Sequence, residues 1–109
     1  MGVIPEERRS AVRMKYDVSY WVADSDGESI PLLPEFRRVR GCDLSPIGIS
    51  FYSDSPPKSE QVALMFKGQK YHSYMLARVV HHKSCLLEGQ RRYLIGCHFL
   101  RSLSPEKDK

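Results

Sequence analysis

Two short motifs carry the residue types that could bind a charged ligand. Arg9 and Arg13 lie four positions apart in the stretch RSAVR, and Arg8 immediately precedes them. A guanidinium is permanently charged and can donate two parallel hydrogen bonds to a phosphate or to the O6/N7 edge of guanine. This spacing also occurs on ordinary solvated surfaces, so the first motif by itself indicates only that an anion could bind here.

The second motif, DLSPIG, follows Arg13 after 29 intervening residues. Asp43 offers a carboxylate that can accept hydrogen bonds from the N1–H and the exocyclic amine of guanine. Ser45 adds a hydroxyl, and Gly48 permits close approach of a backbone because it has no Cβ. The same residue types are common in tight turns. Taken together, the arginines and Asp43 predict a pocket for a guanine nucleotide.

The elements that must position these motifs are strands. Apolar and polar residues alternate with a period of two along most of the chain, and turn-forming residues separate the alternating runs. No convincing helix is predicted. Six antiparallel strands predict an all-β fold, and a closed barrel is favoured over a sandwich because closure removes exposed strand edges. The predicted strands are residues 14–23, 36–42, 49–52, 62–66, 74–80 and 93–99.

The 109 residues are enough for one domain with a single core. Residues 1–10 have no apolar pattern and contain Pro5, so they are predicted to form a flexible N-terminal arm. The barrel is expected to span residues 11–103. Residues 104–109 are polar and are expected to be a disordered tail.

Composition restricts the classes of function. The net charge is +4, with seven basic and seven acidic residues in 1–40 but ten basic and four acidic residues in 58–109. The local balance around the N-terminal arginines suits a discrete anionic ligand better than nucleic acid. Three cysteines without CxxC spacing indicate a reducing compartment. With no secretory signal pattern and no apolar run long enough to span a membrane, a cytoplasmic location is expected.

The combination of RxxxR with DxSxxG in a six-stranded barrel resembles the PilZ domain family. The late strand is similar as well: Val79 and Val80 precede a closing strand, YLIGCHF, that contains a Gly-x-x-Phe pattern. The resemblance covers about residues 7–103. It implies a six-stranded antiparallel β-barrel that binds the bacterial second messenger cyclic di-GMP. By this resemblance Arg9 and Arg13 clamp the ligand, and Asp43, Ser45 and Gly48 form the second half of the site. A C-terminal helix that many members add is missing here.

The resemblance implies a receptor, not an enzyme, that uses no cofactor. Cyclic di-GMP is expected to order the arginine arm against the barrel, and the changed surface is expected to be recognised by an unidentified effector protein. Arg8 adds a third guanidinium, which could bind a further guanine and favour two ligand molecules per chain. Two alternatives stay open: a small basic barrel that binds RNA or single-stranded DNA, and a PilZ-like protein-interaction module.

Other residues could suggest different chemistry. His81, His82 and Cys85 lie close together, as do Cys97 and His98, but adjacent strand residues point to opposite faces and no metal-ligand spacing is present. No metal site is therefore predicted. Ser45 with a histidine base has no supporting spacing, so catalysis is not expected. Trp21 is interpreted as a packing residue. Arg37, Arg38 and Arg40 are interpreted as a solvated face, with Arg40 near enough to add positive potential at the site.

Overall fold

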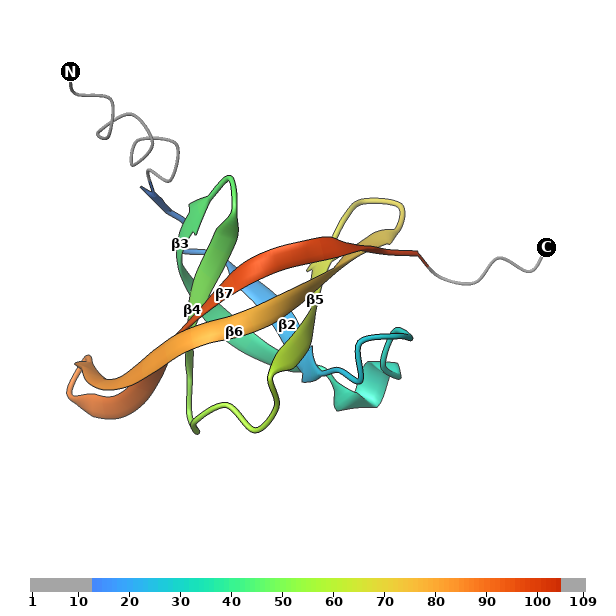
Figure 1. Ribbon diagram of the computed structural model, residues 1–109. Coiled ribbons are helices and arrows are strands. Elements are labelled where there is room, and N and C mark those ends of the chain that lie inside the picture. Colours follow the sequence, from blue (N-terminus) through green and yellow to red (C-terminus); the bar gives the residue numbers. More distant parts are fainter. Residues whose placement is uncertain (1–12, 105–109) are drawn as a thin grey trace, which may run out of the picture.

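Seven β-strands and one short 3-10 helix make up the computed structural model, which describes residues 13–104 (Figure 1). The predicted arm, residues 1–10, and the tail beyond Ser104 lie outside the described residues. No helix among residues 13–104 is long and apolar enough to cross a membrane. The elements are β1 (Met14–Lys15), β2 (Ser19–Asp24), η1 (Leu33–Glu35), β3 (Arg37–Ser45), β4 (Gly48–Ser53), β5 (Gln61–Lys67), β6 (His72–Leu87) and β7 (Gln90–Leu103).

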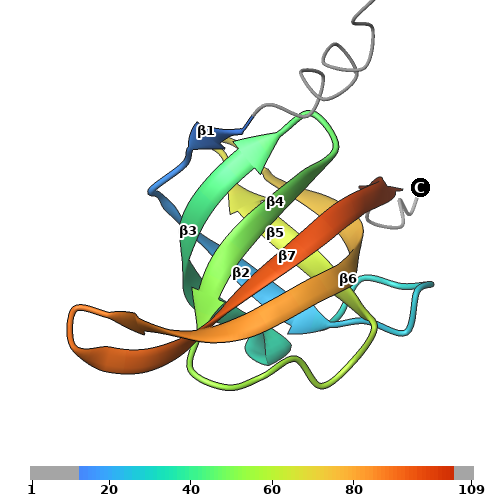
Figure 2. The ribbon, with the colours of Figure 1, turned by 60° about the vertical axis from the view of Figure 1, so that its left-hand side comes forward.

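The strands form a closed antiparallel barrel. Hydrogen-bonded neighbours follow the order β3-β2-β5-β6-β7-β4, and β4 pairs back with β3 to close the sheet (Figure 2). β1 pairs with β3 on the same edge as β2, so β1 and β2 together occupy one position in the barrel. The predicted six-stranded antiparallel barrel is confirmed.

A β-bulge separates β1 from β2. The Val18 N–H donates to the Tyr16 carbonyl at 2.9 Å, while the Gly41 N–H of β3 donates to the Val18 carbonyl at 2.9 Å. A Cβ on Gly41 would lie 2.5 Å from the Tyr16 oxygen and 2.8 Å from the Val18 oxygen, so only glycine fits opposite this bulge. The predicted unbroken alternation from Met14 to Val22 was wrong here, because the extra residue turns Val18 to the surface, where it is 45% exposed.

Alternate residues of every long strand fill the barrel interior. Tyr20 and Phe51 pack edge to face with their ring centroids 6.1 Å apart. The ring of Tyr20 also packs against that of Phe66, with their centroids 5.2 Å apart. A smaller buried cluster lies on the other face of β5 and β6. Ile30 and Phe36, which flank η1, pack against this cluster. The interior of the barrel is therefore apolar. Its buried residues are Tyr20, Val22, Val39, Ile49, Phe51, Val62, Leu64, Ala77, Ile95 and Cys97.

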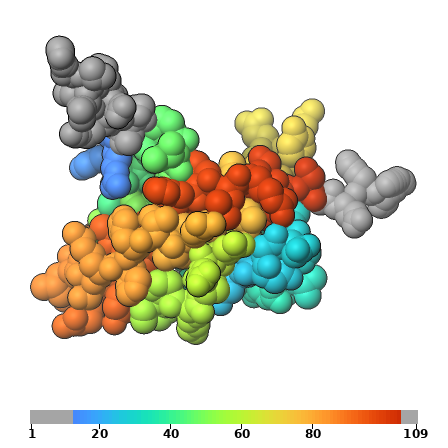
Figure 3. Space-filling model, in the orientation of Figure 1, coloured from blue at the N-terminus to red at the C-terminus, as the bar shows by residue number. Residues whose placement is uncertain are grey.

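The hairpin of β6 and β7 is much longer than predicted. Its strands have 16 and 14 residues and are joined by the two-residue turn Glu88–Gly89, whereas the predicted strands covered only residues 74–80 and 93–99. Both turn residues have positive φ, 54° at Glu88 and 82° at Gly89. The hairpin extends beyond the barrel (Figure 1 and Figure 3), and Glu88 Oε2 lies 3.3 Å from the Arg40 guanidinium of β3. This ion pair joins the turn to the barrel wall.

Candidate functional site

The DLSPIG motif forms a tight turn between two strands. Asp43 to Ser45 end β3, Pro46 and Ile47 form the turn, and Gly48 begins β4 opposite Ser45. The Ile47 N–H donates to Ser45 Oγ at 3.3 Å. A Cβ on Gly48 would overlap the carbonyl oxygen of Cys97 in β7, so glycine is what lets β4 lie against β7 here. The motif is therefore built into the wall of the barrel.

Asp43 is held by its cross-strand partner. The two-residue turn sets the hairpin register so that Ser50 lies opposite Asp43. Ser50 Oγ donates to Asp43 Oδ1 at 2.7 Å, and it accepts from the Asp43 N–H at 3.2 Å. The orientation of the carboxylate is thus fixed by a residue that is only 4% exposed.

Ser50 is in turn connected to the core. The Tyr20 hydroxyl donates to the Ser50 carbonyl at 3.0 Å. Burial raises the pKa of Tyr20 well above its usual value, so this hydroxyl keeps its proton and remains a donor. A chain of polar contacts therefore runs from the barrel interior through Ser50 to Asp43 at the surface.

Arg13 brings the first motif to the second. Its Nη1 lies 3.6 Å from Asp43 Oδ2, with the two side chains 57% and 26% exposed. A carboxylate has about four acceptor positions. Ser50 uses one on Oδ1, and Arg13 uses one on Oδ2, which also lies 3.9 Å from Cys42 Sγ. Asp43 therefore retains acceptor capacity toward a ligand, and Arg13 retains donors.

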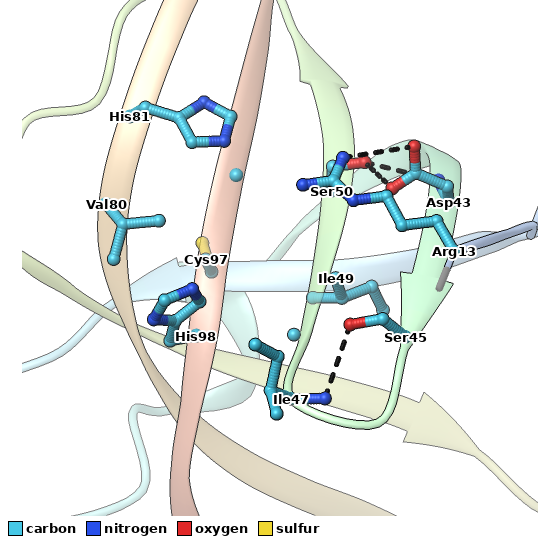
Figure 4. A pocket seen from close by; sticks show the side chains of 12 residues that line it. Arg13, Asp43, Ser45, Ile47, Ile49, Ser50, Val80, His81, Cys97 and His98 are labelled. Carbon is cyan, nitrogen blue, oxygen red and sulfur yellow. Dashed lines mark hydrogen bonds and ion pairs between the residues drawn. The ribbon is translucent and has the colours of Figure 1, made fainter. Parts of the chain in front are cut away.

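These residues line one cavity on the outer wall of the barrel (Figure 4). Its volume is about 100 Å³. Ligand pockets usually enclose about 300–1,000 Å³, so the described residues enclose less space than a typical ligand pocket. The lining residues are Arg13, Asp43, Ser45, Ile47, Gly48, Ile49, Ser50, Val80, His81, Gly96, Cys97 and His98.

Four of the six residues predicted for the site, Arg13, Asp43, Ser45 and Gly48, lie on this cavity. The other two, Arg8 and Arg9, lie outside the described residues. Sequence reasoning missed three polar lining residues, which are Ser50, His81 and His98. A two-residue turn at Pro46 and Ile47 would have indicated Ser50, because it places residue 50 opposite residue 43.

Cys97 forms part of the cavity floor. Burial raises the pKa of the Cys97 thiol to about 12, so it stays neutral at physiological pH. Within residues 13–104, no three histidine, cysteine or acidic side chains come together as a metal site would require. The described part of the cavity therefore offers hydrogen-bonding and charged groups, and no assembled metal centre.

Arg40 does not face this cavity. It lies on a second groove beside the hairpin tip, where it contacts Asp17 at 3.0 Å and Glu88 at 3.3 Å. Two carboxylates pair with it there, and it does not line the cavity. Trp21 is partly buried against the core, with Lys67 Nζ 4.2 Å from its ring centroid, which agrees with its interpretation as a packing residue.

The family model for the PilZ domain matches residues 7–109. This match covers nearly the whole chain, and the six-stranded antiparallel barrel agrees with it. The chain belongs to the PilZ domain family. No curated protein and no solved structure gave a significant match.

Proposed function

We propose that this protein is a non-enzymatic receptor for cyclic di-GMP. The observation that carries the proposal is the meeting of Arg13 and Asp43, which belong to two separate motifs, across one surface cavity. A permanently charged donor beside a carboxylate suits a ligand that combines anionic phosphates with a guanine edge. Membership of the PilZ domain family supports the same ligand.

Each residue has a role that follows from its chemistry. Arg13, together with Arg9, donates to a phosphate or to the Hoogsteen edge of a guanine. Asp43 accepts from the N1–H and amine of the same base, held in orientation by Ser50. Ser45 and Gly48 flank the Pro46–Ile47 turn at the cavity, where the ligand would bind. Arg8 and Arg9 enter the proposal through their place in the sequence.

The small cavity volume supports a role for the N-terminal segment. A dinucleotide needs more surrounding surface than residues 13–104 supply around the cavity. Residues that precede Arg13 are the nearest in sequence that could supply it, and they include Arg8 and Arg9. Binding would then order this segment over the ligand, and the changed surface would be recognised by an effector protein.

Calorimetric titration of the full chain with cyclic di-GMP tests the proposal. Parallel titrations with cyclic di-AMP, GTP, cyclic GMP and a short oligonucleotide measure selectivity. We expect saturable binding of cyclic di-GMP and much weaker binding of the others, with the stoichiometry read from the same curve. Binding of the oligonucleotide without cyclic di-GMP would refute the proposal and favour a nucleic-acid-binding barrel.

A further inference from the structure

His81 is directed onto the cavity by a second β-bulge. In the pairing of β6 with β7, Val79 lies opposite Cys97 and His81 lies opposite Gly96, which leaves Val80 as an extra residue between them. The bulge changes which side chains of β6 face the cavity, since the side-chain period of a strand is two. His81 lines the cavity as a result, whereas its neighbour His82 does not.

The opposite strand leaves room for the imidazole. A Cβ on Gly96 would overlap the His81 ring at its Nε2 and Cε1 atoms, so the ring lies directly over the backbone of β7. Figure 4 shows His81 across the cavity from Arg13 and Asp43. A bulge and a glycine together therefore place a histidine opposite the pair formed by the two motifs.

The charged and titratable groups around His81 come from several elements. Asp43 of β3 is paired with Arg13, and β4 contributes the neutral hydroxyl of Ser50. β7 contributes His98, while the neutral thiol of Cys97 is buried in the barrel core. A proton gained by His81 would therefore add positive charge that no unpaired carboxylate of the described lining offsets.

We propose that His81 is a further ligand-binding residue, which donates a hydrogen bond to a phosphate of cyclic di-GMP and binds it more tightly when protonated. This inference rests on the proposed function. Imidazole is the side chain that ordinarily changes charge between about pH 8 and about pH 5, whereas a phosphodiester stays anionic in that range. Affinity should accordingly be higher at acidic pH than at alkaline pH.

The test is a series of calorimetric titrations of the full chain with cyclic di-GMP between about pH 8 and about pH 5.5 at constant ionic strength. A charge-assisted hydrogen bond changes affinity by about tenfold or more, so we expect wild type to bind about tenfold more tightly at the acidic end. His81→Gln should lose this pH dependence. His81→Lys, which is charged throughout, should bind at the alkaline end about as tightly as wild type does at the acidic end.

His82→Gln is the matched control, because it removes the adjacent histidine of the same strand without touching the cavity lining. It should keep the wild-type pH profile, which excludes a general effect of losing a surface imidazole. The same pH dependence in wild type and His81→Gln, or its loss in His98→Gln alone, would overturn the inference and leave cyclic di-GMP binding intact. Absence of binding by every variant at every pH would instead overturn the proposed function, and the role of His81 with it.

Discussion

Removal of the Arg13 guanidinium tests whether the two motifs form one binding site. In the free protein this group is paired with Asp43, with Nη1 3.6 Å from Oδ2, and its side chain is 57% exposed. Exposed pairs of this kind stabilise proteins by about 0–1 kcal/mol. Arg13→Ala should therefore lower the free energy of unfolding by less than about 1 kcal/mol, and the barrel should remain folded.

The effect on ligand binding should be much larger. A charge-assisted contact with a ligand phosphate contributes about 1.5–3 kcal/mol, which corresponds to roughly a ten- to hundred-fold change in affinity. Arg13→Ala should weaken binding of cyclic di-GMP by this factor. Calorimetric titration measures the affinity, and urea unfolding of the same sample measures the stability.

Arg40→Ala provides the matched control. Arg40 is also a β-barrel surface arginine, 45% exposed and paired with carboxylates, but it lies on the second groove. Its removal lowers the net charge equally and should change the affinity by no more than about twofold, since the Debye length of about 8 Å limits its influence. Unchanged binding by a folded Arg13→Ala, or equal losses in both variants, would refute the reasoning.

Three further predictions concern other parts of the structure. Asp43→Ala should weaken binding of cyclic di-GMP because a guanine loses its acceptor, while the poor binding of cyclic di-AMP should hardly change; equal binding of both dinucleotides by wild type in calorimetry would contradict this. Gly41→Ala should lower the free energy of unfolding by about 1–3 kcal/mol, since its Cβ would lie 2.5 Å from the Tyr16 carbonyl oxygen. Urea unfolding measures that loss, and wild-type stability would show that the bulge can relax. Cys97, with a pKa of about 12, should resist iodoacetamide at neutral pH in the folded protein while the other two cysteines react. Mass spectrometry should thus find a third alkylated cysteine only after unfolding. Alkylation of all three cysteines in the native protein would refute the burial of Cys97.

The barrel could be predicted because its strands follow a simple period. Tyr20 and Val22 occupy alternate positions of the predicted strand 14–23, Ile95 lies in the predicted strand 93–99, and each of the three is almost completely buried. The bulge at Val18 could not be predicted, because the apolar residues from Met14 to Val22 alternate across it without interruption. Gly41 is the nearest to a signal, since glycine within a strand often marks a bulge or a close backbone approach.

The length of the β6–β7 hairpin was underestimated because of its turn residues. A two-residue turn with positive φ at both positions favours asparagine, aspartate or glycine at each position. The first position here is Glu88, which is none of these. The long side chain of Glu88 brings its carboxylate to Arg40 on β3, which a shorter side chain at this position could not do as readily. A tertiary contact thus accounts for the residue type where local preference would not.

The candidate site was partly visible in the sequence. Asp43, Ser45 and Gly48 are close together along the chain, so their spacing indicated a shared turn, and the alternating strands indicated where that turn would lie. His81 was not predicted to face the cavity, since its orientation depends on the bulge at Val80 and on the absence of a side chain at Gly96. The orientation of His81 therefore depends on how β6 pairs with β7, which the pattern of a single strand does not indicate.

The two-residue turn at Pro46 and Ile47 also determines how this site responds to changes in chain length. Ser50 lies opposite Asp43 only because two residues separate the paired positions 45 and 48. One added or deleted residue in the turn would shift the register, and with a side-chain period of two it would carry Ser50 to the other face of the sheet. Substitutions can therefore adjust the affinity in steps, whereas a single insertion or deletion in this turn would remove the Asp43 contact entirely.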